Sequence, residues 1–215
     1  MEQIIKYELI INKALRSALE YDKPDEQINE FIRFFGQHIG SDRFYIFEDD
    51  IKNHATDNTY EWCANDVTPQ INELQQVDMD IIEWWYQSFD KGENIMITDI
   101  ESIKEIHPLS YDILKMQNVV NLAVSPLRYK DQIRGFFGVD NPPMGDFKRL
   151  SEFLDMIGTL LISLLKLRNS FHKANESARL SSYSALAQIY LTMYLVDIKD
   201  GTYYTIKRSE HIDKS

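Results

Sequence analysis

The sequence predicts an α+β fold, in which a central antiparallel sheet has helices on both faces and long helices flank it at the N- and C-terminal ends. Regions 43–65 and 119–140 each hold two runs of strand formers joined by a polar connection, which is typical of antiparallel pairs. The region between them carries helix-start signals. A long apolar repeat of helical period follows Pro142-Pro143.

Residues 1–24 are expected to form an N-terminal dimerisation helix. Its apolar stripe consists of Ile4, Tyr7, Ile11, Ala14, Ala18 and Tyr21. These positions alternate at spacings of three and four, as in the seam of a coiled coil. The run Asp22-Lys23-Pro24-Asp25 ends this helix. A second helix follows over 26–38, and Gly40 stands at its C-cap.

The first strand pair is predicted from two short runs rich in aromatic and β-branched residues. Residues 43–48, RFYIFE, form the first strand, and residues 59–65, TYEWCAN, form the second. In the second run Tyr60 and Trp62 alternate with Glu61 and Cys63, so we expect the two pairs to face opposite sides of the sheet.

Helical signals dominate residues 67–118. Thr68-Pro69 reads as a helix start, with Thr68 as the N-cap. Asp80 is predicted to cap a further helix that runs through Trp84, Trp85, Tyr86 and Phe89. A short strand, NIMITDI, follows over 94–100, and Pro108 starts another helix.

The closing hairpin spans residues 119–140, with its turn at Lys130-Asp131. In its second strand Ile133, Phe137 and Val139 share one parity, so we expect them on one face. The sequence Gly135-Phe136-Phe137-Gly138 lacks the Lys-Ser/Thr of a phosphate-binding loop, and no helix follows it directly. We therefore interpret its glycines as structural.

A long C-terminal helix is predicted after an Asp146 cap. Its apolar repeat consists of Phe147, Leu150, Leu154, Ile157, Leu161, Leu164 and Phe171, and only Arg168 interrupts it. Because Phe153, Leu160 and Leu167 widen the apolar face, we expect the helix to contact the sheet on one side and a partner helix on the other. The predicted homodimer interface consists of Ile4, Ile11, Ile157, Leu161, Leu164 and Phe171.

The final segment, 180–215, predicts the start of a second module. Strand formers at 193–198 and 202–207 flank Asp200-Gly201, a strong hairpin signal. Because two strands and a helix cannot form a stable core alone, we expect this module to be incomplete. Residues 169–179 then form a connecting helix between it and a sensor domain over 25–168.

Composition argues against several classes of function. The formal net charge of −11 disfavours nucleic acids and anionic membranes as partners. The single cysteine, Cys63, excludes an intrachain disulfide and a zinc site built on several cysteines, and it favours a cytoplasmic setting. The most apolar run, 156–165, is about half the ~20 residues that a membrane-spanning helix needs.

No catalytic or metal-binding pattern is found among the remaining residues. The five histidines share no ligand spacing, and no nucleophile motif such as Gly-x-Ser-x-Gly is present. We therefore expect no catalytic residues, no metal site and no enzyme activity in this chain.

Three stretches resemble the GAF domain family, in the order and spacing that this family has. IGSDRFYIFEDD resembles its first strand, ENIMITDI its middle strand and NVVNLAVSPLRYKDQIRGFFGVDN its closing hairpin. The resemblance covers about Asp25 to Arg168. It implies a sensory or dimerising input module of a signalling protein, and residues 180–215 resemble the opening of a PAS-like module. A diguanylate cyclase is the output that such bacterial arrays suggest.

The resemblance also implies a ligand cavity, walled on one side of the sheet by the helical insertion. The candidate lining residues are Tyr45, Trp62, Cys63, Trp84, Trp85 and Phe137. Bilin-carrying relatives attach their pigment through a Cys-His pair, but Ala64 follows Cys63 here. Three hypotheses stay open: a sensor of an unknown small molecule, a ligand-free dimerisation scaffold, and a small enzyme of the same fold.

Overall fold

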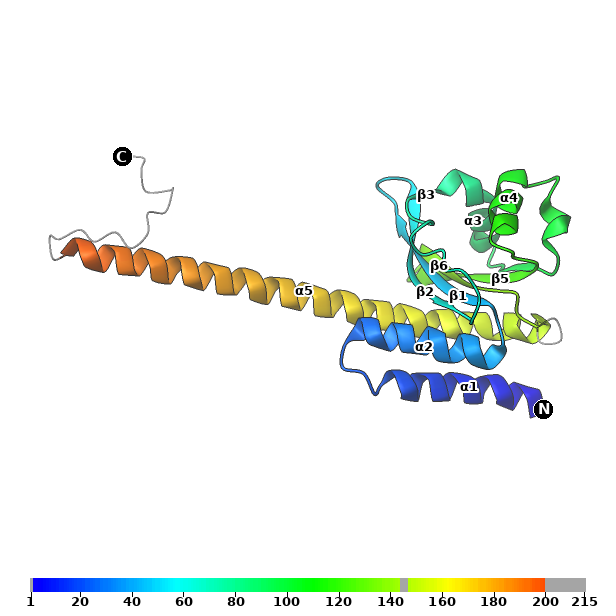
Figure 1. Cartoon of the computed structure of the whole chain (residues 1–215), viewed down its shortest axis with the longest axis horizontal. Coiled ribbons are helices and arrows are strands. Elements are labelled where there is room, and N and C mark those ends of the chain that lie inside the picture. The colour runs from blue at the N-terminus through cyan, green and yellow to red at the C-terminus, as the bar shows by residue number, and fades with distance from the viewer. Residues whose placement is uncertain (1, 144–146, 200–215) are drawn as a thin grey trace. The chain divides into compact units, whose positions relative to one another are not determined.

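The computed structural model describes residues 2–143 and 147–199, and it places side chains over 9–143, 150–151 and 153–184. The chain divides into two compact units, Met1–Arg168 and Asn169–Ser215. The first unit contains a sheet of six antiparallel strands in the order β3-β2-β1-β6-β5-β4 (Figure 1). The strands are β1 (Arg43–Asp50), β2 (Ala55–Cys63), β3 (Val77–Asp78), β4 (Ile95–Ile97), β5 (Leu122–Tyr129) and β6 (Gln132–Asp140). This arrangement confirms the predicted α+β class.

Helices cover both faces of this sheet (Figure 1). On one face lie α2 (Pro24–Ile39) and the start of α5 (Phe147–Lys199), and α1 (Glu2–Ala18) packs on α2. On the other face lie α3 (Glu83–Asp90), α4 (Pro108–Met116) and the 3-10 helices η1 (Met79–Ile82) and η2 (Ile100–Ile103). Each face has its own apolar core. Strand alternation sends Phe44 and Ile46 into the first core, and Tyr45 and Phe47 into the second.

Three of the residues that the sequence predicted at a dimer interface lie in the first core instead. Ile11, Ile157 and Leu161 are 3%, 0% and 0% exposed and belong to this core, so a partner helix cannot reach them while the unit is folded. Leu164 packs partly against the same core, and Phe171 is exposed in the second unit. The side chain of Ile4 lies outside the described residues. A stripe of helical period predicts burial but does not say which surface covers it.

Arg168 interrupts that stripe because it forms an ion pair within the first unit. Its Nη1 and Nη2 donate to Oε1 and Oε2 of Glu48 on β1, each at 2.7 Å. Nη1 also donates to the hydroxyl of Tyr60 at 3.2 Å. The two side chains of the ion pair are only 13% and 25% exposed. The positive charge of Arg168 is therefore neutralised by Glu48 at the edge of the apolar contact between α5 and the sheet.

The helix predicted from Thr68-Pro69 is wrong, because residues 67–76 form turns and irregular structure. The carboxylate of Glu61 accepts hydrogen bonds from the backbone nitrogens of Gln70 and Ile71, at 2.8 and 3.1 Å. These bonds satisfy the backbone without a helix. The expected N-cap Asp80 is also wrong, since Asp78 caps η1 by accepting from the nitrogen of Asp80.

Other predicted boundaries are confirmed. Gly40 ends α2 in the left-handed conformation, with φ 74°, and Pro108 begins α4. The turn Lys130-Asp131 joins β5 to β6.

The expected parity of the closing strand is confirmed for Phe137 and Val139, which both belong to the first core, and is wrong for Ile133, because β6 contains a bulge. Arg128 pairs with Ile133, whereas Pro126 pairs with Phe136, so β6 has one more residue than β5 between these pairs. Gly135 lies in the bulge with φ 140°. As a result Ile133 and Phe136 face the second core, and Phe137 faces the first.

The helix α5 continues to Lys199, so the predicted strand at 193–198 is wrong. Leu, Met and Lys favour a helix here, and no glycine or proline occurs between Gly158 and Gly201 to end it. The predicted partner strand, 202–207, lies outside the described residues, and the predicted domain boundaries stay predictions. Among the described helices, none combines the length and apolar character that crossing a membrane requires.

Candidate functional site

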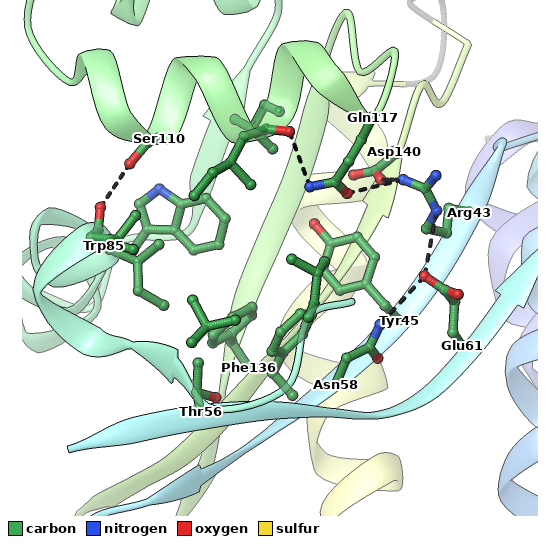
Figure 2. Close-up of a pocket in the computed structure, with 17 residues that line it drawn as sticks. Arg43, Tyr45, Thr56, Asn58, Glu61, Trp85, Ser110, Gln117, Phe136 and Asp140 are labelled. Atoms are coloured by element: carbon green, nitrogen blue, oxygen red, sulfur yellow. Dashed lines mark hydrogen bonds and ion pairs between the residues drawn. The ribbon is translucent and has the colours of Figure 1, made fainter. Parts of the chain in front are cut away.

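A cavity of about 60 Å³ lies between the sheet and the helices of the second core (Figure 2). Strands β1, β2, β3 and β6, with η1, α3, α4 and the 67–76 segment, contribute its walls. Its apolar lining consists of Phe47, Leu74, Val77, Ile81, Ile82, Trp85, Ile113, Leu114 and Phe136. Its polar lining consists of Arg43, Tyr45, Thr56, Asn58, Glu61, Ser110, Gln117 and Asp140. This mixture is typical of small-molecule sites, where a few polar groups orient a ligand in an apolar pocket.

The guanidinium of Arg43 organises the polar end of the cavity. Nη1 donates to Asp140 Oδ2 at 2.7 Å and to Gln117 Oε1 at 3.4 Å. Nη2 donates to the backbone oxygen of Thr68 at 3.1 Å, and Nε lies 3.4 Å from Glu61 Oε1. Nη1 and Nη2 are therefore hydrogen-bonded within the chain, whereas Nε is near the Glu61 carboxylate without forming a hydrogen bond.

Two carboxylates share this single buried cation. The side chains of Arg43, Asp140 and Glu61 are 2–3% exposed. Burial raises the pKa of Asp140 to about 6, although the charge of Arg43 partly opposes this effect. Burial, followed by the nearby charge of Asp140, also holds the pKa of Tyr45 well above its usual range. When both carboxylates are ionised, the cluster of Arg43, Asp140 and Glu61 thus has a net negative charge.

Three buried polar atoms of lining residues have no hydrogen-bond partner among the described residues. They are Oδ1 of Asp140, Nε of Arg43 and Nε1 of Trp85, and Trp85 is only 5% exposed. The neighbouring Trp84 is satisfied, since its Nε1 donates to Ser110 Oγ at 3.0 Å and its ring stacks on His107. An unsatisfied buried polar atom costs about 1–3 kcal/mol. Such atoms are expected where a bound molecule completes the hydrogen bonding.

The structure brings two of the six candidate pocket residues to the cavity, Tyr45 and Trp85. Trp62 and Phe137 lie on the opposite face, because Trp62 pairs with Phe44 rather than Tyr45, and the bulge in β6 turns Phe136 to the cavity instead of Phe137.

The other two candidates do not line the cavity. Trp84 turns its ring toward His107, and Cys63 is half-buried at the end of β2. Burial raises the pKa of the Cys63 thiol to about 11, so this thiol stays protonated at neutral pH.

Sequence reasoning missed the polar end of the cavity. Arg43 and Asp140 are 97 residues apart in the sequence, and they meet because β1 and β6 pair in a register that places them opposite each other. The one available signal was alternation, because Arg43, Tyr45 and Phe47 share a strand face. A charged residue in the same alternation as buried aromatics indicates a buried polar group.

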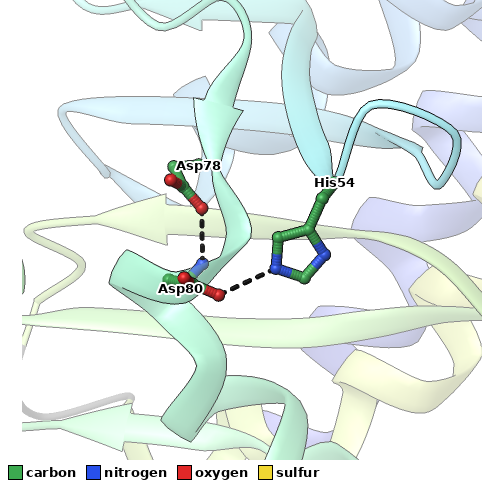
Figure 3. Close-up of side chains that lie close together, drawn as sticks. All are labelled: His54, Asp78 and Asp80. Atoms are coloured by element: carbon green, nitrogen blue, oxygen red, sulfur yellow. Dashed lines mark hydrogen bonds and ion pairs between the residues drawn. The ribbon is translucent and has the colours of Figure 1, made fainter.

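An exposed cluster lies at the edge of the sheet, where His54, Asp78 and Asp80 have ligand-type atoms within 4.8 Å of one another (Figure 3). His54 Nε2 lies 2.8 Å from Asp80 Oδ1, and this hydrogen bond raises the pKa of His54. Asp78 caps η1. The cluster is accounted for by local hydrogen bonding, and we assign no ligand to it.

Comparisons with known proteins identify the fold. No family model matches the sequence. A curated relative, a methanogenesis regulatory histidine kinase of Methanothrix harundinacea, is 26% identical over 122 residues, which are 54% of this chain and 13% of the relative. The chain therefore matches only a small part of that protein.

Two solved structures are similar to the chain. A far-red-absorbing dark-state protein with bound biliverdin IXa has a TM-score of 0.62 and 11% identity, over 74% of this chain and 99% of that one. The GAF domain of an Acinetobacter phosphoenolpyruvate-protein phosphotransferase has a TM-score of 0.56 and 10% identity, over 78% and 97%. At these identities the likeness shows that the fold is a GAF fold.

Proposed function

We propose that this chain, which has the GAF fold, is a regulatory small-molecule-sensing and dimerisation module of a multidomain signal-transduction protein. The observation that carries the proposal is the cavity with its three unpartnered buried atoms, Asp140 Oδ1, Arg43 Nε and Trp85 Nε1. A cavity that served packing alone would be lined by apolar or satisfied groups. The name of the curated relative, a regulatory histidine kinase, supports a role in signalling.

A continuous path links the cavity to α5. Tyr45 and Phe47 line the cavity from β1, and the next residue on that strand, Glu48, binds Arg168 on α5 through two hydrogen bonds of 2.7 Å. A ligand changes the helix only if it binds two arrangements of the module with different affinity. Couplings of about 1–3 kcal/mol are typical for such regulation.

The dimerisation part of the proposal uses surface that the folded unit leaves exposed. Leu167 in the first unit is 50% exposed, and the second unit exposes Phe171, Leu180 and Tyr183. Leu167→Asp should reduce the mass measured by light scattering from that of a dimer to that of a monomer, while the melting temperature of the unit stays unchanged. An unchanged dimer mass would exclude Leu167 from the interface.

The proposal also includes an output domain outside this chain. The curated relative is named a histidine kinase, which favours a kinase output over the diguanylate cyclase that the sequence resemblance suggested. A cytoplasmic location and a homodimer belong to the same proposal.

A ligand-free scaffold is the second candidate, and the size of the cavity favours it. At about 60 Å³ the cavity holds only a few water molecules. The scaffold hypothesis requires that no small molecule stabilises the folded chain.

A thermal-shift screen separates the two candidates, because a ligand at roughly 100 times its dissociation constant stabilises the folded state by about 2.7 kcal/mol. The library should contain amines, carboxylic acids, amino acids, nucleosides and tetrapyrroles. Val77→Trp fills the cavity from β3, and Val120→Trp is the matched control at a position 59% exposed. Sensing predicts a hit whose shift is lost in the first variant and kept in the second. No hit in any class would favour the scaffold.

A further inference from the structure

We infer that the ligand of this cavity is a small organic cation, an amine or amidine with an apolar body, whose N–H group donates to Asp140 Oδ1. This inference rests on the proposed sensing function and adds the chemical class of the ligand. It is argued from the charge balance of the polar end, from the unpartnered atoms and from the size of the cavity.

The charge balance disfavours an anionic ligand. A second cavity of about 340 Å³, which is more polar, adjoins the first and shares Arg43, Gln117 and Asp140 with it. Among the residues lining the two cavities, Arg43 is the single basic side chain, whereas the acidic ones are Asp42, Glu61, Asp66 and Asp140. An entering carboxylate or phosphate would therefore meet an excess of negative charge.

Arg43 cannot serve as an anion receptor without losing its present partners. Nη1 and Nη2 donate to Asp140, Gln117 and Thr68 at 2.7 to 3.4 Å. Nε makes no hydrogen bond, but it lies 3.4 Å from the carboxylate of Glu61, which an anion at this nitrogen would displace. An anionic ligand would have to displace one of two buried carboxylates from this guanidinium. That exchange leaves a buried charge without a partner, which is strongly unfavourable.

A cation restores the balance instead. Ionised Asp140 and Glu61 carry two negative charges against the one positive charge of Arg43. The Tyr45 hydroxyl also interacts with the Asp140 carboxylate, but Oδ1 makes no hydrogen bond. An ammonium or amidinium group that donates to Oδ1 satisfies this acceptor and brings the second positive charge. Hydrogen bonds between charged groups in a water-poor site are about twice as strong as neutral ones.

The rest of the cavity limits the body of the ligand. Trp85 and Asp140 lie on opposite sides of the cavity (Figure 2), whose apolar lining includes Phe47 and Phe136. The free Nε1–H of Trp85 favours a ligand with an acceptor or an aromatic face at its far end. The volume of about 60 Å³ requires a small body, well below the size of a tetrapyrrole.

The inference is tested with matched probes on the full 215-residue chain. One set is benzylamine, benzyl alcohol and benzoate, and the other is 3-(aminomethyl)pyridine, 3-(hydroxymethyl)pyridine and pyridine-3-carboxylate. Binding is measured at pH 7 by calorimetry and by ligand-detected NMR. We expect at least one amine to bind at least tenfold more tightly than the alcohol and the acid of its set.

Two variants locate the binding. Asp140→Asn keeps the shape and removes the charge, so amine affinity should fall at least tenfold. Trp85→Phe keeps an aromatic ring and removes the N–H, so affinity for the pyridine amine should fall several-fold more than affinity for benzylamine. If Asp140→Asn fails to fold, the amine-to-alcohol ratio of the unmodified chain and the Trp85→Phe result decide the question.

The failures can be told apart. An acid or alcohol that binds as tightly as its amine overturns the cationic class and leaves the sensing function intact. Amines that do not bind at a dissociation constant of about 1 mM or better also overturn it. If the broad thermal-shift library then yields no ligand of any class, the sensing function itself fails.

Discussion

The charge of Asp140 should make the stability of the folded chain depend on pH between pH 5 and 7. The perturbation is Asp140→Asn, which removes the titrating group and keeps a side chain of the same size. Burial raises the pKa of Asp140 from 3.8 to about 6 in the folded state. Arg43, Tyr45 and Glu61 are the titratable groups that face it. Because the folded-state pKa is the higher one, the stabilising contribution is fully present below about pH 4 and is lost as the pH rises through about 6.

The magnitude follows from this difference in pKa. A difference of about two units corresponds to about 3 kcal/mol over the whole range. Between pH 7 and pH 5 the unfolded chain keeps Asp140 ionised, whereas the folded chain changes from mostly ionised to mostly protonated. When the pH falls from 7 to 5, the free energy of unfolding of the unmodified chain should therefore increase by about 1 kcal/mol more than that of Asp140→Asn.

Urea denaturation of both proteins at pH 7 and pH 5 measures this double difference. Any pH-independent change in the stability of the variant cancels in the comparison. Glu30 and Glu101 have lowered pKa values, so their contributions change mainly below their ordinary value of 4.5 and are shared by both proteins. If the stability of the two proteins depends equally on pH, burial does not raise the pKa of Asp140 in the folded state.

Four further variants test the packing and the link to α5. Glu48→Gln removes one side of the buried bidentate pair with Arg168 and should cost about 1.5–3 kcal/mol in urea denaturation, a loss that a solvent-exposed pair would not show. Leu161→Ala should cost about 2–5 kcal/mol because Leu161 is fully buried, whereas Leu167→Ala should cost little; equal losses would contradict the assignment of the core. Gly135→Ala should cost at least about 2 kcal/mol, since a Cβ there would lie 2.0 Å from a carbonyl oxygen of β1 and the residue has φ 140°; an unchanged melting temperature would rule out this close approach.

The sequence predicted the sheet well because its strand signals are local. A run of aromatic and β-branched residues marked β1, and Lys130 with Asp131 marked the turn between β5 and β6. Local helix-start and helix-end signals also correctly predicted that α4 begins at Pro108 and that α2 ends at Gly40. These features depend on residues within about four positions of one another, so a single sequence contains the information needed.

The remaining features depend on contacts between distant residues. Arg43 and Asp140 meet only through strand register, and Glu61 holds a distant loop in a non-helical form, which overrides the helix-start signal at Thr68. The apolar stripe that includes Leu161 predicted burial correctly, but only the folded unit shows that its own core covers the stripe. The bulge in β6, which puts Ile133 on the face opposite to Phe137 and Val139, could not be predicted for the same reason.

The most direct test of a ligand site in this cavity is the indole N–H signal of Trp85 in a nitrogen-15 spectrum during ligand titration. The chain has three tryptophans, and Trp85→Phe assigns the signal by its loss. We predict that a stabilising ligand shifts the Trp85 signal, because its Nε1 gains a partner. The Trp84 signal should move much less, because Trp84 Nε1 already donates to Ser110 Oγ. The Trp62 signal should also move much less, because the Trp62 side chain lies on the other face of the sheet. A stabilising ligand that leaves Trp85 unmoved would contradict binding in this cavity.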